Sequence, residues 1–307
     1  MKVIYLGTPE FAVAPLKAII ESQKHEVVAV VTQPDRPVGR KNIITPPPVK
    51  VVALENGIPV FQYEKIRAEG VEDLKNVGAD IMITCAYGQI LSKEIIDICP
   101  HGIINIHASL LPKYRGAAPI QYAVINGEKT TGVTVMQTEV GLDTGDIIEA
   151  FETPIGESET AGDLFVRLSE LGAEKICSVL DKIEKGEVNP QKQDESQAFV
   201  VKTIKKEDAL IDFSKSSIEI KNLINGMNPW PIAYTFANGK KLKIYRAIAI
   251  DESGKQGEVI KADKKLYIAC GEGAIEVLEL QEEGGKVMNA LSYLNGRKLK
   301  VGDLLGA

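Results

Sequence analysis

Short apolar runs alternate with helical patterns in the first part of the chain, and this alternation limits the folds open to it. Apolar strand candidates lie at 3–6, 27–32, 81–85 and 103–107. Helical periodicity is found between them, at 11–20, 49–56 and 93–98. Strands that alternate with helices predict a parallel sheet with helices on both faces. Ligands of such sheets bind beyond the carboxyl ends of the strands.

A different pattern begins near residue 186. Before it we predict strands at 131–137 and 147–153 and a long amphipathic helix at 161–185. The stretch 189–197 is polar and contains a proline, which predicts a linker. After a short helix at 216–225, strand-like runs follow at 232–236, 242–249, 257–262, 266–269 and 275–280. Short strands with tight turns predict a small barrel or sandwich.

The fold class predicted from these patterns is therefore α/β, with a second, smaller β domain. We place an N-terminal α/β domain at 1–188, a linker at 189–206 and a C-terminal domain at 207–307. A chain of 307 residues is long enough for two such domains. It has no apolar run near the roughly 20 residues that a membrane helix needs.

The charge balance argues against a chain built mainly to bind nucleic acid. The net charge is −6, and the sequence pI is about 5.4. From residue 207 onward, however, 14 basic residues balance 14 acidic ones. The charge balance of the C-terminal part is therefore compatible with a local basic surface.

Cysteine and histidine spacing indicates neither a disulfide framework nor a zinc site. The four cysteines form no Cys-x-x-Cys pair, and reduced thiols suit a cytoplasmic protein. The three histidines have no zinc-site spacing with each other or with a cysteine. We expect no metal.

Three polar residues are candidates for chemistry. Asn105 and His107 lie two apart at the end of a predicted strand, so their side chains share one face. Asp143 lies in a loop between Gly141 and Gly145. Taken singly, each residue is more often a hydrogen-bonding, capping or turn residue than a catalyst, and only the combination indicates a site.

Two short motifs are set aside. The stretch 127–132 has the glycine spacing of a phosphate-binding loop, but valine stands where that loop requires lysine. The Asp-Thr-Gly string at 143–145 matches an aspartic-protease signature, which needs a second aspartate in an all-β setting. The α/β pattern before it disfavours that interpretation.

The string Asn-Ile-His-Ala-Ser-Leu-Leu-Pro at 105–112, followed by Gly-Leu-Asp-Thr-Gly-Asp at 141–146, resembles the folate-dependent formyltransferases. Four further stretches, at 7–11, 32–40, 115–121 and 228–231, resemble the methionyl-tRNA formyltransferase family in particular. The resemblance runs over nearly the whole chain. It implies a Rossmann-like formyltransferase domain followed by an OB-like C-terminal barrel that binds tRNA.

The resemblance also implies an activity and its catalytic residues. The formyl group of 10-formyltetrahydrofolate, consumed as a co-substrate, would pass to the α-amino group of methionyl initiator tRNA. Asn105 and His107 would stabilise negative charge on the formyl oxygen, and Asp143 would relay protons and orient His107. The protein would be a monomeric cytoplasmic enzyme that does not associate with a membrane.

Binding residues follow from the same resemblance. The folate site would comprise two stretches: Ser109, Leu110, Leu111 and Pro112, and Tyr87, Gly88, Gln89, Ile90 and Leu91. The tRNA contacts would come from Arg36, Arg40 and Lys41, and from Lys240, Lys241 and Lys243. The first three lie in the proline-rich stretch 34–48. We expect this stretch to be a loop without secondary structure of its own. Loops of this length are typically functional or disordered.

Other functions stay open from the sequence. A formyltransferase acting on an amino-sugar nucleotide is the nearest alternative, since such enzymes also carry a second domain. One acting on glycinamide ribonucleotide is disfavoured by the length of this chain. A tRNA-binding module with an inactive site is the alternative from another class.

Overall fold

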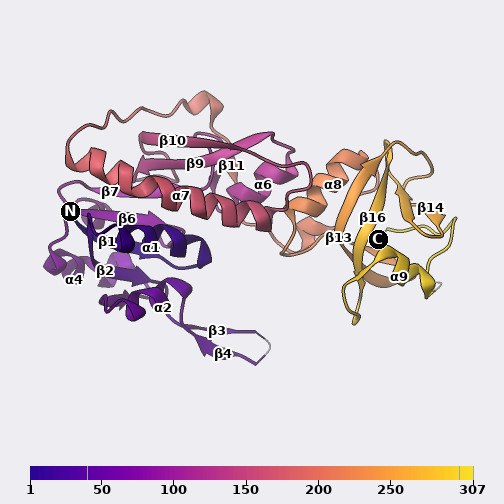
Figure 1. Cartoon of the computed structure of the whole chain (residues 1–307), viewed down its shortest axis with the longest axis horizontal. Coiled ribbons are helices and arrows are strands. Elements are labelled where there is room, and N and C mark those ends of the chain that lie inside the picture. The colour runs from indigo at the N-terminus through magenta and orange to yellow at the C-terminus, as the bar shows by residue number, and fades with distance from the viewer. Residues whose placement is uncertain (40, 297, 307) are drawn as a thin grey trace. The chain divides into compact units, whose positions relative to one another are not determined.

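The structure is a computed structural model that describes residues 1–39, 41–296 and 298–306 (Figure 1). It divides into two compact units. The first unit comprises 1–116, 131–153 and 165–200, and the second comprises 117–130, 154–164 and 201–307. The domain limits placed at 188 and 207 stay a prediction.

A seven-stranded sheet forms the centre of the first unit. Its strand order is β10-β9-β7-β6-β1-β2-β5. The strands from β7 to β5 are parallel, whereas β9 runs antiparallel to β7. The α/β class is confirmed, although the sheet is not wholly parallel. The strands are β1 (Lys2–Gly7), β2 (Glu26–Thr32), β5 (Val60–Gln62), β6 (Ile81–Cys85), β7 (Ile103–His107), β9 (Thr130–Gln137) and β10 (Ile147–Pro154).

Helices cover both faces of this sheet. On one face Ile4, Leu6 and Met82 share a buried cluster with Ile66, Leu74 and Ile95 from the short helices. On the other face a Cβ at Gly172 would meet Ile106 Cγ2 at 3.2 Å, so the glycine lets α7 approach β7 closely. The helices are η1 (Glu10–Ala12), α1 (Val13–Ser22), α2 (Pro48–Glu55), α3 (Ile66–Glu69), α4 (Val71–Val77), α5 (Lys93–Ile96) and α7 (Ala161–Glu184).

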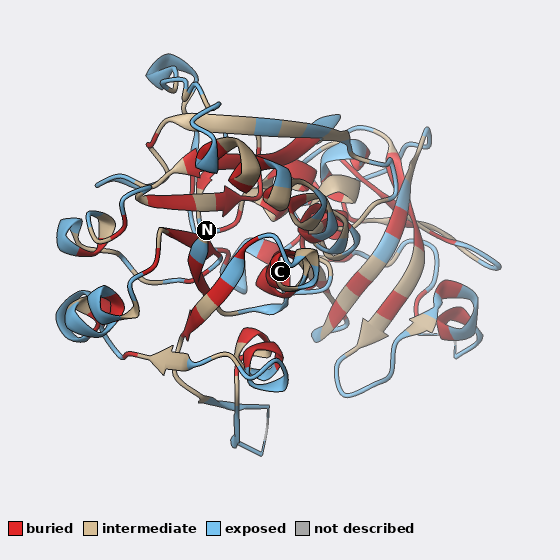
Figure 2. Cartoon of the chain, turned by 60° about the vertical axis from the view of Figure 1, so that its left-hand side comes forward, coloured by how far each residue is buried: buried red, intermediate tan, exposed pale blue. Residues whose placement is uncertain are grey.

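Burial explains why the central strands read as continuous apolar runs. All five residues of β6 are buried, as are Val3 to Gly7 of β1 (Figure 2). A strand covered on both faces has no polar side to alternate with, as expected for parallel sheets. The predicted limits of β6 and β7 match the structure residue for residue.

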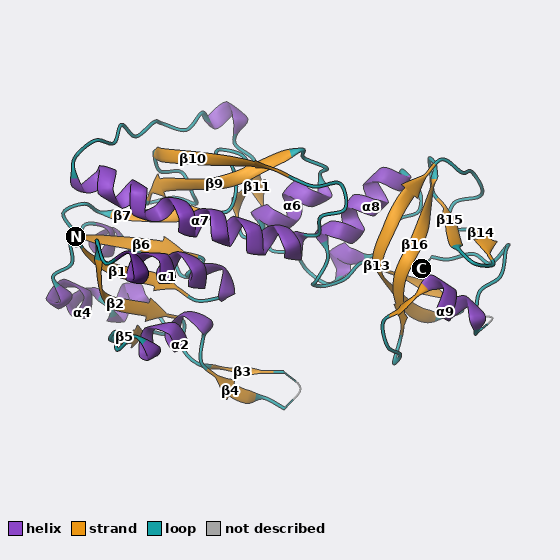
Figure 3. Cartoon of the chain, in the orientation of Figure 1, coloured by secondary structure: helices purple, strands orange, loops and turns teal. Residues whose placement is uncertain are grey.

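The stretch 34–48 differs from the sequence prediction. It contains a hairpin of β3 (Arg36–Val38) and β4 (Ile43–Thr45), which projects from the first unit (Figure 3). The expectation of a loop without its own structure was wrong. Each strand has three residues, all exposed, and Pro37 lies within β3. A proline and the lack of apolar alternation remove the usual strand signal.

The second unit is built on a curved antiparallel sheet. Its strand order is β12-β13-β16-β15-β14, with β17 paired to β16. The register shifts around Arg246, where β13 pairs with β16, and such irregularities bend a strand. This half-barrel confirms the predicted C-terminal β domain. Its strands are β12 (Tyr234–Ala237), β13 (Lys240–Ile250), β14 (Val259–Ala262), β15 (Leu266–Ala269), β16 (Ala274–Glu282) and β17 (Met288–Asn289).

Helices pack against this sheet around a second buried core, which includes Ile220, Ile224 and Leu294. A capping box between Ser216 and Glu219 begins α8 (Ser217–Gly226). The other helices of this unit are α6 (Pro119–Ile125), η3 (Glu207–Ala209) and α9 (Ala290–Asn295). The chain also forms β8 (Arg115–Gly116), η2 (Glu195–Gln197) and β11 (Val200–Val201). Among the described helices, none has the length and apolar composition needed to cross a membrane.

Candidate active site

The polar candidates lie at the carboxyl edge of the first unit's sheet. The strand β7 ends at His107, and its neighbour β6 ends at Cys85. The parallel register places Asn105 beside Thr84 of β6. On the other side β9 places Met136 opposite Asn105 and Thr134 opposite His107. This is the edge at which a ligand of such a sheet is expected.

The amide of Asn105 is oriented by its neighbour on β6. The Thr84 hydroxyl donates to Asn105 Oδ1 at 2.9 Å. Because the amide oxygen is held there, the Asn105 NH₂ group is directed away from Thr84. Asn105 is partly exposed, while Thr84 is buried. The site therefore presents an oriented amide donor.

His107 is buried and held between two partners. Its Nε2 lies 3.0 Å from the Tyr114 carbonyl oxygen. A carbonyl oxygen only accepts, so Nε2 carries a proton and donates. The other ring nitrogen, Nδ1, lies 3.8 Å from Asp143 Oδ2. A proton can pass between these groups through a small movement or one water molecule.

Asp143 is a turn residue whose carboxylate lies close to His107. Its backbone is in the left-handed region with φ 54°, which aspartate tolerates better than most residues. Its carboxylate oxygen Oδ2 accepts a hydrogen bond from the Gly116 N–H at 2.8 Å. The turn conformation is therefore compatible with the role that the sequence analysis expects of Asp143, because the carboxylate lies 3.8 Å from His107 Nδ1.

The stretch from Ser109 to Pro112 forms a braced loop after β7. The Ser109 hydroxyl donates to the Lys113 carbonyl oxygen at 2.7 Å. The Thr134 hydroxyl donates to the Ser109 carbonyl oxygen at 2.7 Å and accepts from the Leu111 N–H at 3.2 Å. The side chains of Ser109 and Leu111 are buried, while Leu110 and Pro112 are partly exposed. The accessible parts of this loop are therefore its backbone and the side chains of Leu110 and Pro112.

The loop after β6 carries the other five predicted folate contacts. Gln89 is used internally: its Oε1 accepts from the Ile66 N–H at 2.9 Å, and its Nε2 donates to the Tyr63 carbonyl oxygen at 2.8 Å. Tyr87 is buried and Leu91 is partly buried, whereas Gly88 is exposed. Ile90 is 77% exposed, so its apolar side chain is accessible.

The predicted tRNA contacts fall on two surfaces. In the hairpin, Lys41 is exposed, and Arg36 Nη2 forms an ion pair with Glu64 Oε2 at 2.5 Å. Arg40 lies outside the described residues. On β13 the three lysines Lys240, Lys241 and Lys243 do not share one face, because side chains alternate along a strand.

Two aromatic residues that the sequence did not single out lie beside the β13 lysines. Tyr234 of β12 is paired with Lys243, and Phe236 is paired with Lys241. The Lys241 ammonium lies 4.0 Å from the centroid of the Tyr234 ring. Tyr234 and Phe236, like Lys241 and Lys243, are two apart on their strand. With the pairing register known, this spacing would have placed the four side chains together on one face of the sheet.

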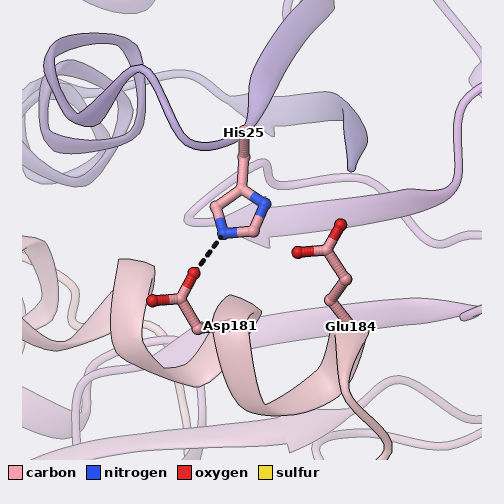
Figure 4. Close-up of side chains that lie close together, drawn as sticks. All are labelled: His25, Asp181 and Glu184. Carbon is pink, nitrogen blue, oxygen red and sulfur yellow. Dashed lines mark hydrogen bonds and ion pairs between the residues drawn. The ribbon is translucent and has the colours of Figure 1, made fainter.

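A polar cluster around His25 could be mistaken for a metal centre (Figure 4). Ligand atoms of His25, Asp181 and Glu184 lie within 4.8 Å of one another. Cationic groups already face the two carboxylates: Lys24 Nζ lies 2.8 Å from Asp181 Oδ2, and the Met1 amino group lies 3.2 Å from Glu184 Oε1. The charges of the cluster are balanced, and we assign no metal to it.

A hollow of about 650 Å³ lies beside this cluster. Its lining includes Lys2 and Glu26, the first residues of β1 and β2. It therefore lies at the amino edge of the parallel strands, at the opposite end of the sheet from His107. We do not include it in the candidate site.

Comparison with known proteins defines the class. Residues 1–180 match the family model described as formyl transferase, and residues 203–298 match the formyl transferase C-terminal domain. The chain belongs to the formyl transferase family, which confirms the resemblance inferred from the sequence.

Relatives of known name match over the full chain. A protein of Citrifermentans bemidjiense named methionyl-tRNA formyltransferase is 47% identical over 100% of this chain and 96% of its own length. One of the same name from Clostridium novyi is 46% identical over 99% of this chain and 100% of its own length.

Solved structures share the fold at lower identity. An N-formyltransferase from Helicobacter canadensis, in complex with folinic acid and dTDP-3-aminofucose, has a TM-score of 0.69 and 22% identity, over 90% of this chain and 98% of its own. HypX from Aquifex aeolicus, in complex with tetrahydrofolic acid, has a TM-score of 0.65 and 18% identity, over 98% of this chain and 48% of its own.

Proposed function

We propose that the protein transfers the formyl group of 10-formyltetrahydrofolate to the α-amino group of methionyl initiator tRNA. The product is N-formylmethionyl-tRNA, which initiates protein synthesis. Full-length relatives at 46–47% identity, all named methionyl-tRNA formyltransferase, support this acceptor. The observation that carries the chemistry is the approach of Asp143 Oδ2 to within 3.8 Å of His107 Nδ1, next to the oriented amide of Asn105.

The first step is attack of the neutral amine on the formamide carbon of the donor. Negative charge then develops on the formyl oxygen. The Asn105 NH₂ group, and His107 when its Nδ1 carries a proton, are the donors that stabilise this oxyanion. Removal of one such donor typically lowers the rate by about 100- to 1000-fold.

The second requirement is movement of protons. The attacking nitrogen loses a proton, and N10 of the folate gains one as the C–N bond to the formyl group breaks. Asp143 and His107 Nδ1 form the relay. A strong base is unnecessary, because an α-amino group has a reference pKa of about 7.7–8.0 and is partly neutral near pH 7.5.

The donor binds across the loops after β6 and β7. Backbone groups of 109–112 and of 87–91 read the polar edge of the pterin ring. Leu110 and Ile90 offer apolar surface to its faces, since both side chains are accessible. Ser109 and Gln89 hold the shape of these loops through their hydrogen bonds.

The tRNA contacts are a separate part of the proposal. The β3–β4 hairpin carries Arg36 and Lys41, and Arg40 precedes Lys41 in the sequence. The β13 face carries Lys241 and Lys243, with Lys240 at the start of the strand. Cationic side chains at these places bind phosphates and give an affinity that falls steeply with salt. We also propose that the enzyme is a monomer and works in the cytoplasm.

The test offers purified protein 10-formyltetrahydrofolate with each of three acceptors: methionyl initiator tRNA, methionyl elongator tRNA and an amino-sugar nucleotide. Formylmethionine should appear with the initiator tRNA, and uncharged initiator tRNA serves as the control. Formylation of the sugar nucleotide alone would replace the proposal with the amino-sugar alternative. Binding of tRNA without any formylation would favour a binding module with an inactive site.

A further inference from the structure

The loop that carries Asp143 needs outside support. Asp143 has φ 54°, and Gly145 lies so close to the Gln137 carbonyl oxygen that a Cβ there would be 1.8 Å from it. Left-handed backbone is less favourable for a residue with a Cβ than for glycine, aspartate included. The position of the Asp143 carboxylate therefore depends on contacts that hold the loop in this conformation.

Gln193 provides such contacts from the segment that the sequence predicted to be a linker. Its Nε2 donates to the Asp143 carbonyl oxygen at 2.8 Å and to the Gly145 carbonyl oxygen at 2.7 Å. One amide group thus bridges both ends of the three-residue turn 143–145. Both N–H bonds of that amide are used in this bridge.

Arg115 fixes the direction of the Gln193 amide. Its Nε and Nη2 atoms lie 3.0 Å and 2.8 Å from Gln193 Oε1. A guanidinium has only donors, so the amide oxygen must face it and the NH₂ group must face the Asp143 loop. The arginine side chain is only 4% exposed, and its other edge is held by Glu195 at 2.9 Å and 2.7 Å.

We propose that Gln193 is a positioning residue for formyl transfer, acting through Asp143 and oriented by Arg115. The proposal rests on the proposed function and deepens it. The Arg115–Gln193 pair holds the carboxylate of Asp143 on the Gly116 N–H and near His107 Nδ1. Loss of the clamp should lower kcat and leave the KM for both substrates nearly unchanged.

Two substitutions test the clamp. Gln193→Ala removes it, and we expect kcat to fall about tenfold or more, the size of one or two lost hydrogen bonds. Gln193→Glu keeps the shape and pairs with Arg115, yet places a carboxylate against two carbonyl oxygens. At pH 8 the kcat of Gln193→Glu should be at least as low as that of Gln193→Ala. At lower pH a protonated carboxyl can donate one hydrogen bond, so the variant should regain activity relative to the wild type.

The matched control is Gln197→Ala. Gln197 belongs to the same segment, is exposed and donates to Asp194 Oδ2 at 2.8 Å. Its replacement should leave kcat within about twofold of the wild type. Thermal unfolding and circular dichroism of every variant check that the folded fraction is unchanged.

The decisive comparison uses the Asp143→Asn background. If Gln193 acts through Asp143, adding Gln193→Ala to Asp143→Asn should cause no further loss of kcat. A loss that multiplies in the double variant, or full activity of both Gln193 variants beside an active wild type, would overturn the proposal. A wild-type enzyme that does not formylate methionyl-tRNA would instead overturn the proposed function, and this proposal with it.

Discussion

The Thr84 hydroxyl donates a hydrogen bond to Asn105 Oδ1 at 2.9 Å and so links β6 to the candidate catalytic amide on β7. Thr84 also lies 3.2 Å from the Ile104 carbonyl oxygen. It is buried, which makes an apolar replacement of the same shape tolerable. Thr84 therefore helps to orient the amide group that we propose as a donor to the oxyanion.

Thr84→Val should therefore lower kcat by about fivefold, since one hydrogen bond worth about 1 kcal/mol is lost from the orientation of Asn105. The KM for the folate should change little. Thr84→Ser restores the hydroxyl and should recover most of the activity. Steady-state kinetics of both variants check this, and equal activity of the valine and serine variants would contradict it.

The β13 lysines should contribute to tRNA binding through charge. Lys241→Ala should weaken tRNA binding at low salt and reduce the slope of log affinity against log salt by about 0.7–0.9, the value of one phosphate contact. Lys264→Ala, an exposed lysine in the turn between β14 and β15, is the control and should leave the slope unchanged. Filter binding over a salt series makes the measurement. An unchanged slope for Lys241→Ala would remove Lys241 from the interface.

The ion pair between Arg36 and Glu64 should compete with tRNA. Both side chains are more than half exposed, and exposed pairs contribute little to stability. Glu64→Gln should leave the melting temperature nearly unchanged and lower the KM for tRNA modestly, because Arg36 no longer has to leave a carboxylate. An unchanged KM would mean that Arg36 does not contact the nucleic acid.

The four thiols should differ in reactivity. Burial raises the pKa of Cys85 to about 12 and the pKa values of Cys99 and Cys270 to about 11. Cys177 is partly exposed. Since the thiolate is the reactive form, raised pKa values suppress reaction at pH 8. One thiol should react rapidly with a disulfide reagent in the native protein and four in denaturant. Cys177→Ser should abolish the rapid phase.

The sequence predicted the centre of the first unit well because burial there is continuous. The limits of β6 and β7 follow from apolar runs, and the shared face of Asn105 and His107 follows from their spacing. The approach of Asp143 to His107 did not follow from spacing, because it depends on how the loop folds back. Family resemblance alone joined the three residues.

Features that depend on contacts between distant residues could not be predicted. Gln193 meets Asp143 across 50 residues and Arg115 across 78 residues of sequence. Nothing in a polar, proline-containing stretch distinguishes a loop clamp from a linker. The β3–β4 hairpin was missed for a local reason, since its short exposed strands bury no face that could produce alternation.

The most direct test of the central claim is single-turnover formylation of methionyl initiator tRNA by saturating enzyme and 10-formyltetrahydrofolate. The wild type should form formylmethionyl-tRNA, and Asn105→Ala and His107→Ala should each slow transfer by about 100- to 1000-fold. Both variants should bind tRNA as the wild type does. Asn295→Ala, an exposed asparagine at the end of α9, is the matched control. Transfer at the wild-type rate by either active-site variant would contradict the assignment of these residues.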